Sequence, residues 1–185
     1  MVIINLVNAE KIVHRIPLII SKAKFLFLMV VPVLVGCNRG LVYEEIYQIE
    51  ENAWHKDSTM VFQPLIEDTA TVFNIGFSLE HNNDYPYSNM WLFVDVESPD
   101  GYMQTDTMEF FLAEPDGRWL GRGNDKSRTA NWLYKPGVKL RQPGEYSFSV
   151  RQGMRRDVLE GVMSLSMWLE KAEVRVAETH QDDDL

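Results

Sequence analysis

The segment Phe73–Leu79 places the strongest limit on the fold, because its apolar residues alternate strictly with polar or small ones. Its sequence is Phe-Asn-Ile-Gly-Phe-Ser-Leu. A period of two puts successive side chains on opposite faces of an extended chain. The segment is therefore predicted to be a β-strand with one buried face.

The same alternation recurs at 90–96, 146–150 and 163–169. In the first of these segments the even-numbered residues are expected to face a core, and Trp91 and Phe93 the other side. Further strands are predicted at 107–112 and 118–120. Turn signals containing Pro and Gly separate the strands, at 98–101, 114–117 and 142–144. Short strands between frequent turns predict an all-β, antiparallel β-sandwich of the jelly-roll-like kind.

Three segments do not show this alternation. Residues 41–56 are compatible with a helix or with an extended arm, so they are assigned to a spacer. Residues 152–161 are predicted to form a helical turn, closed by Gly161 just past its end. Residues 173–185 end in Asp-Asp-Asp-Leu and are expected to be an acidic, disordered tail.

The apolar run from Phe25 to Val35 follows Lys22 and Lys24 and leads into Leu-Val-Gly-Cys, ending at Cys37. A basic flank, a short apolar core and a small residue before cysteine are typical of a lipoprotein signal peptide. The thiolate of Cys37 would then take up the lipid. The alternatives are a membrane span or a buried segment, but a span needs about 20 apolar residues. Cys37 is the single cysteine of the chain, so an intramolecular disulfide is excluded.

These features predict four regions. They are a signal peptide at 1–36, a lipidated N-terminus and spacer at 37–57, a β-sandwich domain at 58–172, and the acidic tail at 173–185. Four of the 18 Lys and Arg and one of the 27 Asp and Glu precede Cys37, which leaves 14 basic and 26 acidic residues and a net charge of −12 after cleavage. A charge of this sign argues against nucleic acid as a partner.

The sequence indicates no enzyme, no cofactor and no metal site. His55, His81 and His180 are isolated from one another, and no nucleophile, phosphate-loop or metal-ligand motif occurs. Asp106 with Glu109 could serve as an acid–base pair on a sugar, and Glu97, Asp100 and Asp106 could offer oxygen ligands to calcium. We interpret these carboxylates as solvated surface groups, because acidic proteins scatter such groups over their surface.

Aromatic residues near loops offer the better candidate for a site. The predicted binding surface consists of Tyr85, Tyr87, Trp91, Trp119 and Arg155, with Trp132 as a further aromatic residue near a loop. Such side chains form recognition patches for proteins or sugars. The alternative is that the larger rings close the ends of the sandwich as outer core.

A series of short motifs then follows in a fixed order along nearly the whole chain after the signal segment. They are Cys37, Val42-Tyr43-Glu44, Trp54, Phe62, Asp68, Tyr85-Pro86-Tyr87-Ser88-Asn89, Pro99-Asp100-Gly101, Asp106-Thr107, Leu112-Ala113, 117–121, 143–146, 152–155 and 159–161. Together they resemble the gliding motility lipoproteins of the GldH type from Bacteroidota. The resemblance implies a lipoprotein of the outer envelope associated with gliding machinery. It carries over no catalytic residue, and only Cys37 matches a functional position, the lipid attachment site.

The sequence thus predicts a non-enzymatic lipoprotein, anchored in the membrane through Cys37 and holding envelope protein partners. The expected location is the outer membrane, facing the periplasm, because no acidic run follows Cys37. One alternative is a carbohydrate-binding sandwich that uses the exposed Tyr and Trp residues. Another is a hydrolase with two carboxylates across a concave sheet.

Overall fold

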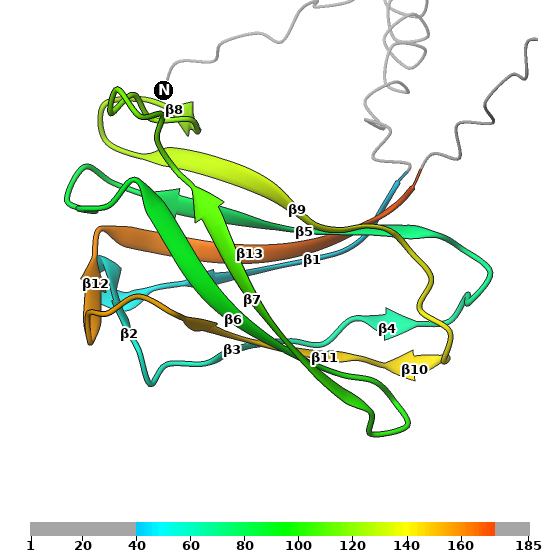
Figure 1. The fold of residues 1–185 in the computed structure, drawn as a ribbon. Helices are drawn as coiled ribbons and strands as arrows, with labels where there is room; N and C mark the ends of the chain where they lie inside the picture. The colour runs from blue at the N-terminus through cyan, green and yellow to red at the C-terminus, as the bar shows by residue number, and fades with distance from the viewer. Residues whose placement is uncertain (1–39, 173–185) are drawn as a thin grey trace, which may run out of the picture. The chain divides into compact units, whose positions relative to one another are not determined.

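A computed structural model of the chain describes residues 40–172, which form a β-sandwich of two main antiparallel sheets (Figure 1). The predicted signal peptide, Cys37 and the predicted tail at 173–185 lie outside the described residues. Among residues 40–172, no helix has the length and apolar character that crossing a membrane requires.

The first sheet contains five strands in the order β1, β13, β5, β9, β8. Their bounds are Leu41–Gln48, Val162–Lys171, Phe73–His81, Arg128–Val138 and Arg122–Gly123. The second sheet has the order β3, β11, β6, β7, with bounds Met60–Phe62, Ser147–Gln152, Asn89–Glu97 and Met103–Phe111. Neighbouring strands in both sheets pair antiparallel, which confirms the predicted all-β antiparallel fold.

Two short strand pairs extend the ends of the sandwich. At one end β2 (Ala53–His55) pairs with β12 (Val158–Glu160), after the 3-10 turn η1 (Glu50–Asn52). At the other end β4 (Leu65–Ile66) pairs with β10 (Gly144–Glu145).

The core lies between the two sheets and contains the apolar residues that the alternation predicted, except Met163, which lies where the register of β13 shifts between Val162 and Ser164. Phe77 and Leu79 of β5 are fully buried, and so are Leu92 and Val94 of β6. The outward side chain of Trp91 is 37% exposed. The strand period was readable in β6 and β11 because one face of each strand is buried and the other is at least partly exposed.

Residues 118–120, predicted as a strand, form only an isolated bridge between Trp119 and Ala113. Two further predictions about local structure were wrong. Leu41–Gln48, assigned to a spacer, is β1 and pairs along β13, so the folded unit begins well before residue 58. Residues 152–161 contain no helical turn; they end β11, pass through bends and form β12. In both cases pairing with a distant strand satisfies the backbone, which overrides a weak local preference.

Polar contacts join the edges of the two sheets at β7 and β9. Asp106 Oδ2 of β7 accepts a hydrogen bond from the Tyr134 hydroxyl at 2.5 Å. The same oxygen forms an ion pair with Lys135 Nζ at 2.8 Å. Gln104 Nε2 donates to Oδ1 at 2.9 Å. Burial raises the pKa of Asp106, but the hydrogen bonds from Lys135, Tyr134 and Gln104 outweigh it and hold the pKa at about 2.

Replacing Asp106 with Asn should reduce the free energy of unfolding by roughly 2 kcal/mol, because Tyr134 and Lys135 lose a charged acceptor. The folded pKa lies below the unfolded value of about 3.9. The Asp106 contribution is therefore complete above about pH 5 and is lost as the pH falls toward 2. Urea unfolding of both proteins at pH 7 and pH 3 measures this, and the difference between the two stabilities at pH 3 should be about half the difference at pH 7.

The control for that measurement is Asp157→Asn, which removes an exposed ion pair with Lys56. It should leave stability nearly unchanged, since exposed ion pairs contribute little. Equal losses for the two variants would contradict the structural role given to Asp106.

The strand pairing also distinguishes the two ends of the sandwich. The start of β1 lies beside the end of β13, and Lys171 of β13 pairs with Phe73, the first residue of β5. At the other end, β5 finishes at His81 and the 82–88 loop leads into β6. In Figure 1 the described chain enters at the right, and the β5–β6 loop lies at the left.

Candidate functional site

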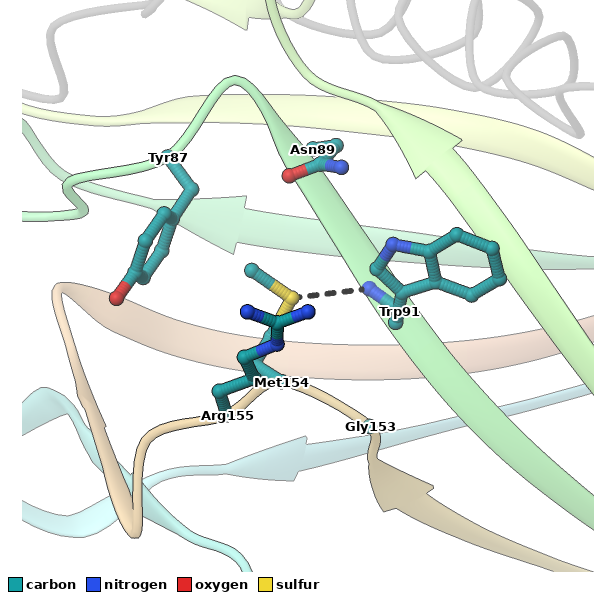
Figure 2. A pocket seen from close by; sticks show the side chains of 6 residues that line it. All are labelled: Tyr87, Asn89, Trp91, Gly153, Met154 and Arg155. Atoms are coloured by element: carbon teal, nitrogen blue, oxygen red, sulfur yellow. Dashed lines mark hydrogen bonds between the residues drawn. The ribbon is translucent and has the colours of Figure 1, made fainter.

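A pocket of about 520 Å³ opens on the second sheet, at the end remote from residue 40. It is lined by Tyr87, Asn89, Trp91, Gly153, Met154 and Arg155 (Figure 2). Tyr87 comes from the 82–88 loop, Asn89 and Trp91 from the start of β6, and the other three from the segment after β11. Three of the five predicted surface residues, Tyr87, Trp91 and Arg155, therefore meet at one place.

Backbone contacts hold the two sides of this pocket together. The Gly153 N–H donates to the Trp91 carbonyl at 2.7 Å, and the Trp91 N–H donates to Met154 Sδ at 3.3 Å. The first bond extends the backbone pairing of β11 with β6 past the last residue of β11, and the second holds the Met154 side chain against β6. The pocket wall thus follows directly from the strand register, in which Gln152 lies opposite Leu92.

Gln152 fixes the segment that carries Arg155. Its side chain is 4% exposed, and both ends of its amide are used. Oε1 accepts from the Met154 N–H at 2.8 Å, and Nε2 donates to the Arg156 carbonyl at 2.8 Å. A buried amide with both groups satisfied holds a bend in one conformation.

The side chains around the pocket combine aromatic, thioether and cationic groups. In Figure 2 the Arg155 guanidinium lies between Tyr87 on one side and Trp91 on the other. Arg156 Nε donates to the Tyr87 hydroxyl at 3.3 Å, and Asn89 Nδ2 donates to Glu109 Oε1 at 2.6 Å. Arg155 and Arg156 are both exposed, so they give this end of an acidic chain a local positive charge.

The other two predicted surface residues, Tyr85 and Trp119, belong to the interior, and this corrects the sequence analysis. Tyr85 is 2% exposed, and its hydroxyl donates to the Asn89 carbonyl at 2.7 Å. Trp119 is partly buried against the core, with its ring centroid 4.5 Å from that of His81. Both close the end of the sandwich, as the alternative interpretation of the aromatic set held.

His81 lies beneath these rings and is fully buried. Burial lowers the pKa of His81, and the positive charge of nearby Arg128 lowers it further. The hydrogen bond between Nδ1 and the Asn82 carbonyl, at 3.0 Å, raises the pKa but does not outweigh these two effects. The buried ring is thereby favoured in its neutral form. His55 is exposed on β2, and His180 lies outside the described residues.

The carboxylates considered for catalysis or calcium do not come together. Asp106 faces Tyr134 and Lys135, whereas Glu109, three residues further along β7, bonds to Asn89 at the pocket. Residues three apart on a strand point to opposite faces, so the two cannot act as an acid–base pair. Among residues 40–172, no group of three or more His, Cys, Asp or Glu is placed to hold a metal ion.

Met154 and Asn89 are pocket residues that the sequence did not single out. Both occur within the quoted motifs Tyr85–Asn89 and Gln152–Arg155, so the proximity of these two motifs to the candidate aromatic residues was the available signal. Their meeting depends on the pairing of β6 with β11, which joins residues some 60 positions apart.

The chain is similar over most of its length to known proteins. A structure of infectious bursal disease virus, Gx strain, gives a TM-score of 0.37 at 17% identity, covering 75% of this chain and about a third (34%) of that one. A TM-score of this size does not establish a shared fold.

The sequence comparisons are stronger. The "GldH lipoprotein" family model matches residues 41–167. The "Gliding motility lipoprotein GldH homolog" of Christiangramia forsetii is 33% identical over 156 residues, covering 80% of this chain and 95% of that protein. The "Gliding motility lipoprotein GldH" of Flavobacterium johnsoniae is 31% identical over 153 residues, covering 79% and 94%. Since the match spans the sandwich from β1 into β13 and nearly the full length of both relatives, the chain belongs to the GldH lipoprotein family.

Proposed function

We propose that the protein is a lipid-tethered component of the cell envelope that holds a protein partner through the pocket at Tyr87, Trp91 and Arg155. The observation that carries this proposal is the convergence of those three side chains, with Met154, on one open pocket. Tyr, Trp, Met and Arg are the residue types enriched where proteins bind one another tightly. The partner would belong to gliding or related envelope machinery, in keeping with the names of the two relatives.

Charge narrows the kind of segment that fits. Arg155 and Arg156 stand beside the pocket, and neither forms an ion pair within 4.0 Å among residues 40–172. A partner segment with a carboxylate next to an aromatic or aliphatic side chain would meet both the cations and the apolar walls. No catalytic step is part of this role.

The position of the tether suits such a role. Cys37 precedes Gly40, the first described residue, by three positions in the sequence. Gly40 lies at the end of the sandwich where Lys171 pairs with Phe73. The pocket lies at the opposite end of the sandwich, where β6 begins. A nine-residue strand such as β5 is about 30 Å long. A lipid on Cys37 would therefore leave the pocket free for a partner, and we place the domain on the periplasmic side of the outer membrane.

The experiment that tests this role is site-specific crosslinking in the native host. A photoreactive phenylalanine analogue replaces Tyr87, and in a matched control it replaces Tyr102, which is 66% exposed and lies at the other end of the sandwich. Position 87 should give a discrete adduct with one or a few envelope proteins, and position 102 should not give the same adduct. Adding Arg155→Glu should reduce the adduct at position 87 by about tenfold, the equivalent of roughly 1.4 kcal/mol.

Two results would overturn the proposal. One is the same set of adducts from both positions, which would show contact without recognition. The other is an adduct at position 87 that Arg155→Glu leaves at full yield, since the cation would then play no part in holding the partner.

A further inference from the structure

A second hollow lies on the outer face of the five-stranded sheet and plays no part in the proposed partner pocket. It has a volume of about 390 Å³ and crosses β1, β13, β5 and β9. The strand register places its lining residues in three parallel rows. The rows of lining residues across the strands are Glu44 and Trp168; Ile46, Ser166, Ser78 and Asn131; and Gln48, Ser164, Glu80 and Thr129.

One end of this hollow is a flat aromatic platform. A Cβ atom on Gly76 would lie 2.0 Å from Cζ2 and 2.4 Å from Cε2 of Trp168, so the indole ring rests directly on the β5 backbone. Trp168 remains partly exposed and lines the hollow. With glycine beneath one face, the ring can offer its other face to a ligand.

The floor beside this platform is made of short hydroxyl side chains. Ser166 and Ser164 are 6% and 7% exposed, and Ser78 lies between β13 and β9. Ser164 Oγ donates to Glu80 Oε2 at 3.5 Å. Ser166 and Ser78 also line the hollow, and each hydroxyl group can donate and accept a hydrogen bond with a ligand.

Longer polar side chains border the floor. Gln48 stands on the β1 side, and Asn131 and Thr129 stand on the β9 side. Neighbouring strands are about 4.8 Å apart, and residues two apart on one strand are about 6.6 Å apart. The serine floor therefore has about the footprint of one six-membered sugar ring.

We propose that this trough is a binding site for a neutral saccharide, with one ring stacked on Trp168 and its hydroxyl groups bonded to the serines, Asn131 and Glu80. A sugar ring combines an apolar face with a rim of hydroxyl groups, which matches a platform beside a polar floor. The charged residues that line the trough are Glu44 and Glu80, both acidic. They oppose uronic acids and phosphorylated sugars, because a carboxylate repels a second anion in a partly buried site.

This site is independent of the Tyr87 pocket, which is built on the other sheet. It also differs from the sugar-binding surface suggested by the sequence, which relied on Trp91 and Trp119. Loss of one function by mutation should leave the other intact, so failure of either proposal can be recognised separately.

The test is isothermal titration calorimetry on the full chain in a polyoxyethylene detergent, which carries no sugar head group. The probes are neutral tetrasaccharides of glucose, galactose, mannose and N-acetylglucosamine, and tetragalacturonate as the anionic probe. At least one neutral probe should bind with a Kd below about 10 mM, and tetragalacturonate should bind at least about tenfold more weakly. Trp168→Ala and Ser166→Val should each weaken binding about tenfold.

Trp91→Ala is the matched control, since it removes an indole from the other site and should leave saccharide affinity unchanged. Thermal unfolding would reveal whether Trp168→Ala fails to fold. Asn131→Ala alters an exposed residue at the rim of the trough, so it should reduce saccharide affinity in a folded protein. The proposal is wrong if no neutral probe binds, if tetragalacturonate binds equally well, or if the folded trough variants all retain full affinity.

Discussion

Gly161→Ala is expected to reduce the free energy of unfolding by more than about 3 kcal/mol, a large part of the 5–15 kcal/mol typical of a domain. Gly161 joins β12 to β13 with φ +81°, a conformation that alanine adopts at a cost of roughly 1–2 kcal/mol. Its new Cβ would also lie 2.2 Å from the backbone nitrogen of Tyr85 and 2.8 Å from the carbonyl carbon of Asp84. Those are backbone atoms, so the 82–85 loop would have to move.

The matched control is Gly101→Ala. Gly101 has the same φ of +81°, but nothing lies within 4 Å of the position of its Cβ. Its free energy of unfolding should therefore fall only by the backbone cost of roughly 1–2 kcal/mol. Urea unfolding of both variants measures the difference, and equal losses would show that the contact with the 82–85 loop is not as close as the structure places it.

The same substitution should affect the partner pocket, because the loop that Gly161 supports leads to Tyr87. The Asn82 N–H donates to the Gly161 carbonyl at 2.8 Å, which fixes the start of that loop. In the crosslinking experiment, Gly161→Ala should therefore lower the yield at position 87 even at temperatures where the protein remains folded.

Cys37→Ala is the second change with a large expected effect. A lipoprotein cysteine carries several acyl chains, and each buried CH₂ contributes about 0.8 kcal/mol to membrane binding. Losing all of them should move the protein almost completely from the membrane fraction to the soluble fraction. Uptake of labelled palmitate should fall to background in the same cells.

The control is Arg155→Glu, which alters the partner pocket and should leave both membrane fractionation and labelling unchanged. If Cys37→Ala protein still fractionates with the membrane and still takes up label, the proposed tether is wrong. If Arg155→Glu releases the protein instead, the partner rather than the lipid holds it at the membrane.

The amino-acid sequence by itself indicated the strands β5, β6, β7, β11 and β13, whereas it did not indicate β1, β9 or β12. Alternation at Phe73–Leu79 and 90–96 is a local property of the chain, since the pleat of a strand sends neighbouring side chains to opposite faces. Family membership could also be inferred from the sequence, because it depends on the order of short motifs. β1 was harder to recognise, since each of its faces carries both apolar and charged residues. Tyr43 and Glu45 lie on one face, and Val42 and Glu44 lie on the other.

Only the tertiary structure decided what each candidate residue does. Tyr85 and Tyr87 are two residues apart, yet one closes the core and the other lines a pocket, because the path of the 82–88 loop determines which ring meets the end of the sheets. Gly161 was predicted to close a helical turn, whereas it joins β12 to β13 and packs against the 82–85 loop, some 80 positions away in the sequence. The pocket at Trp91 and the trough at Trp168 likewise depend on strand pairing. Such pairing is set by long-range burial and hydrogen bonding, which local sequence patterns do not encode.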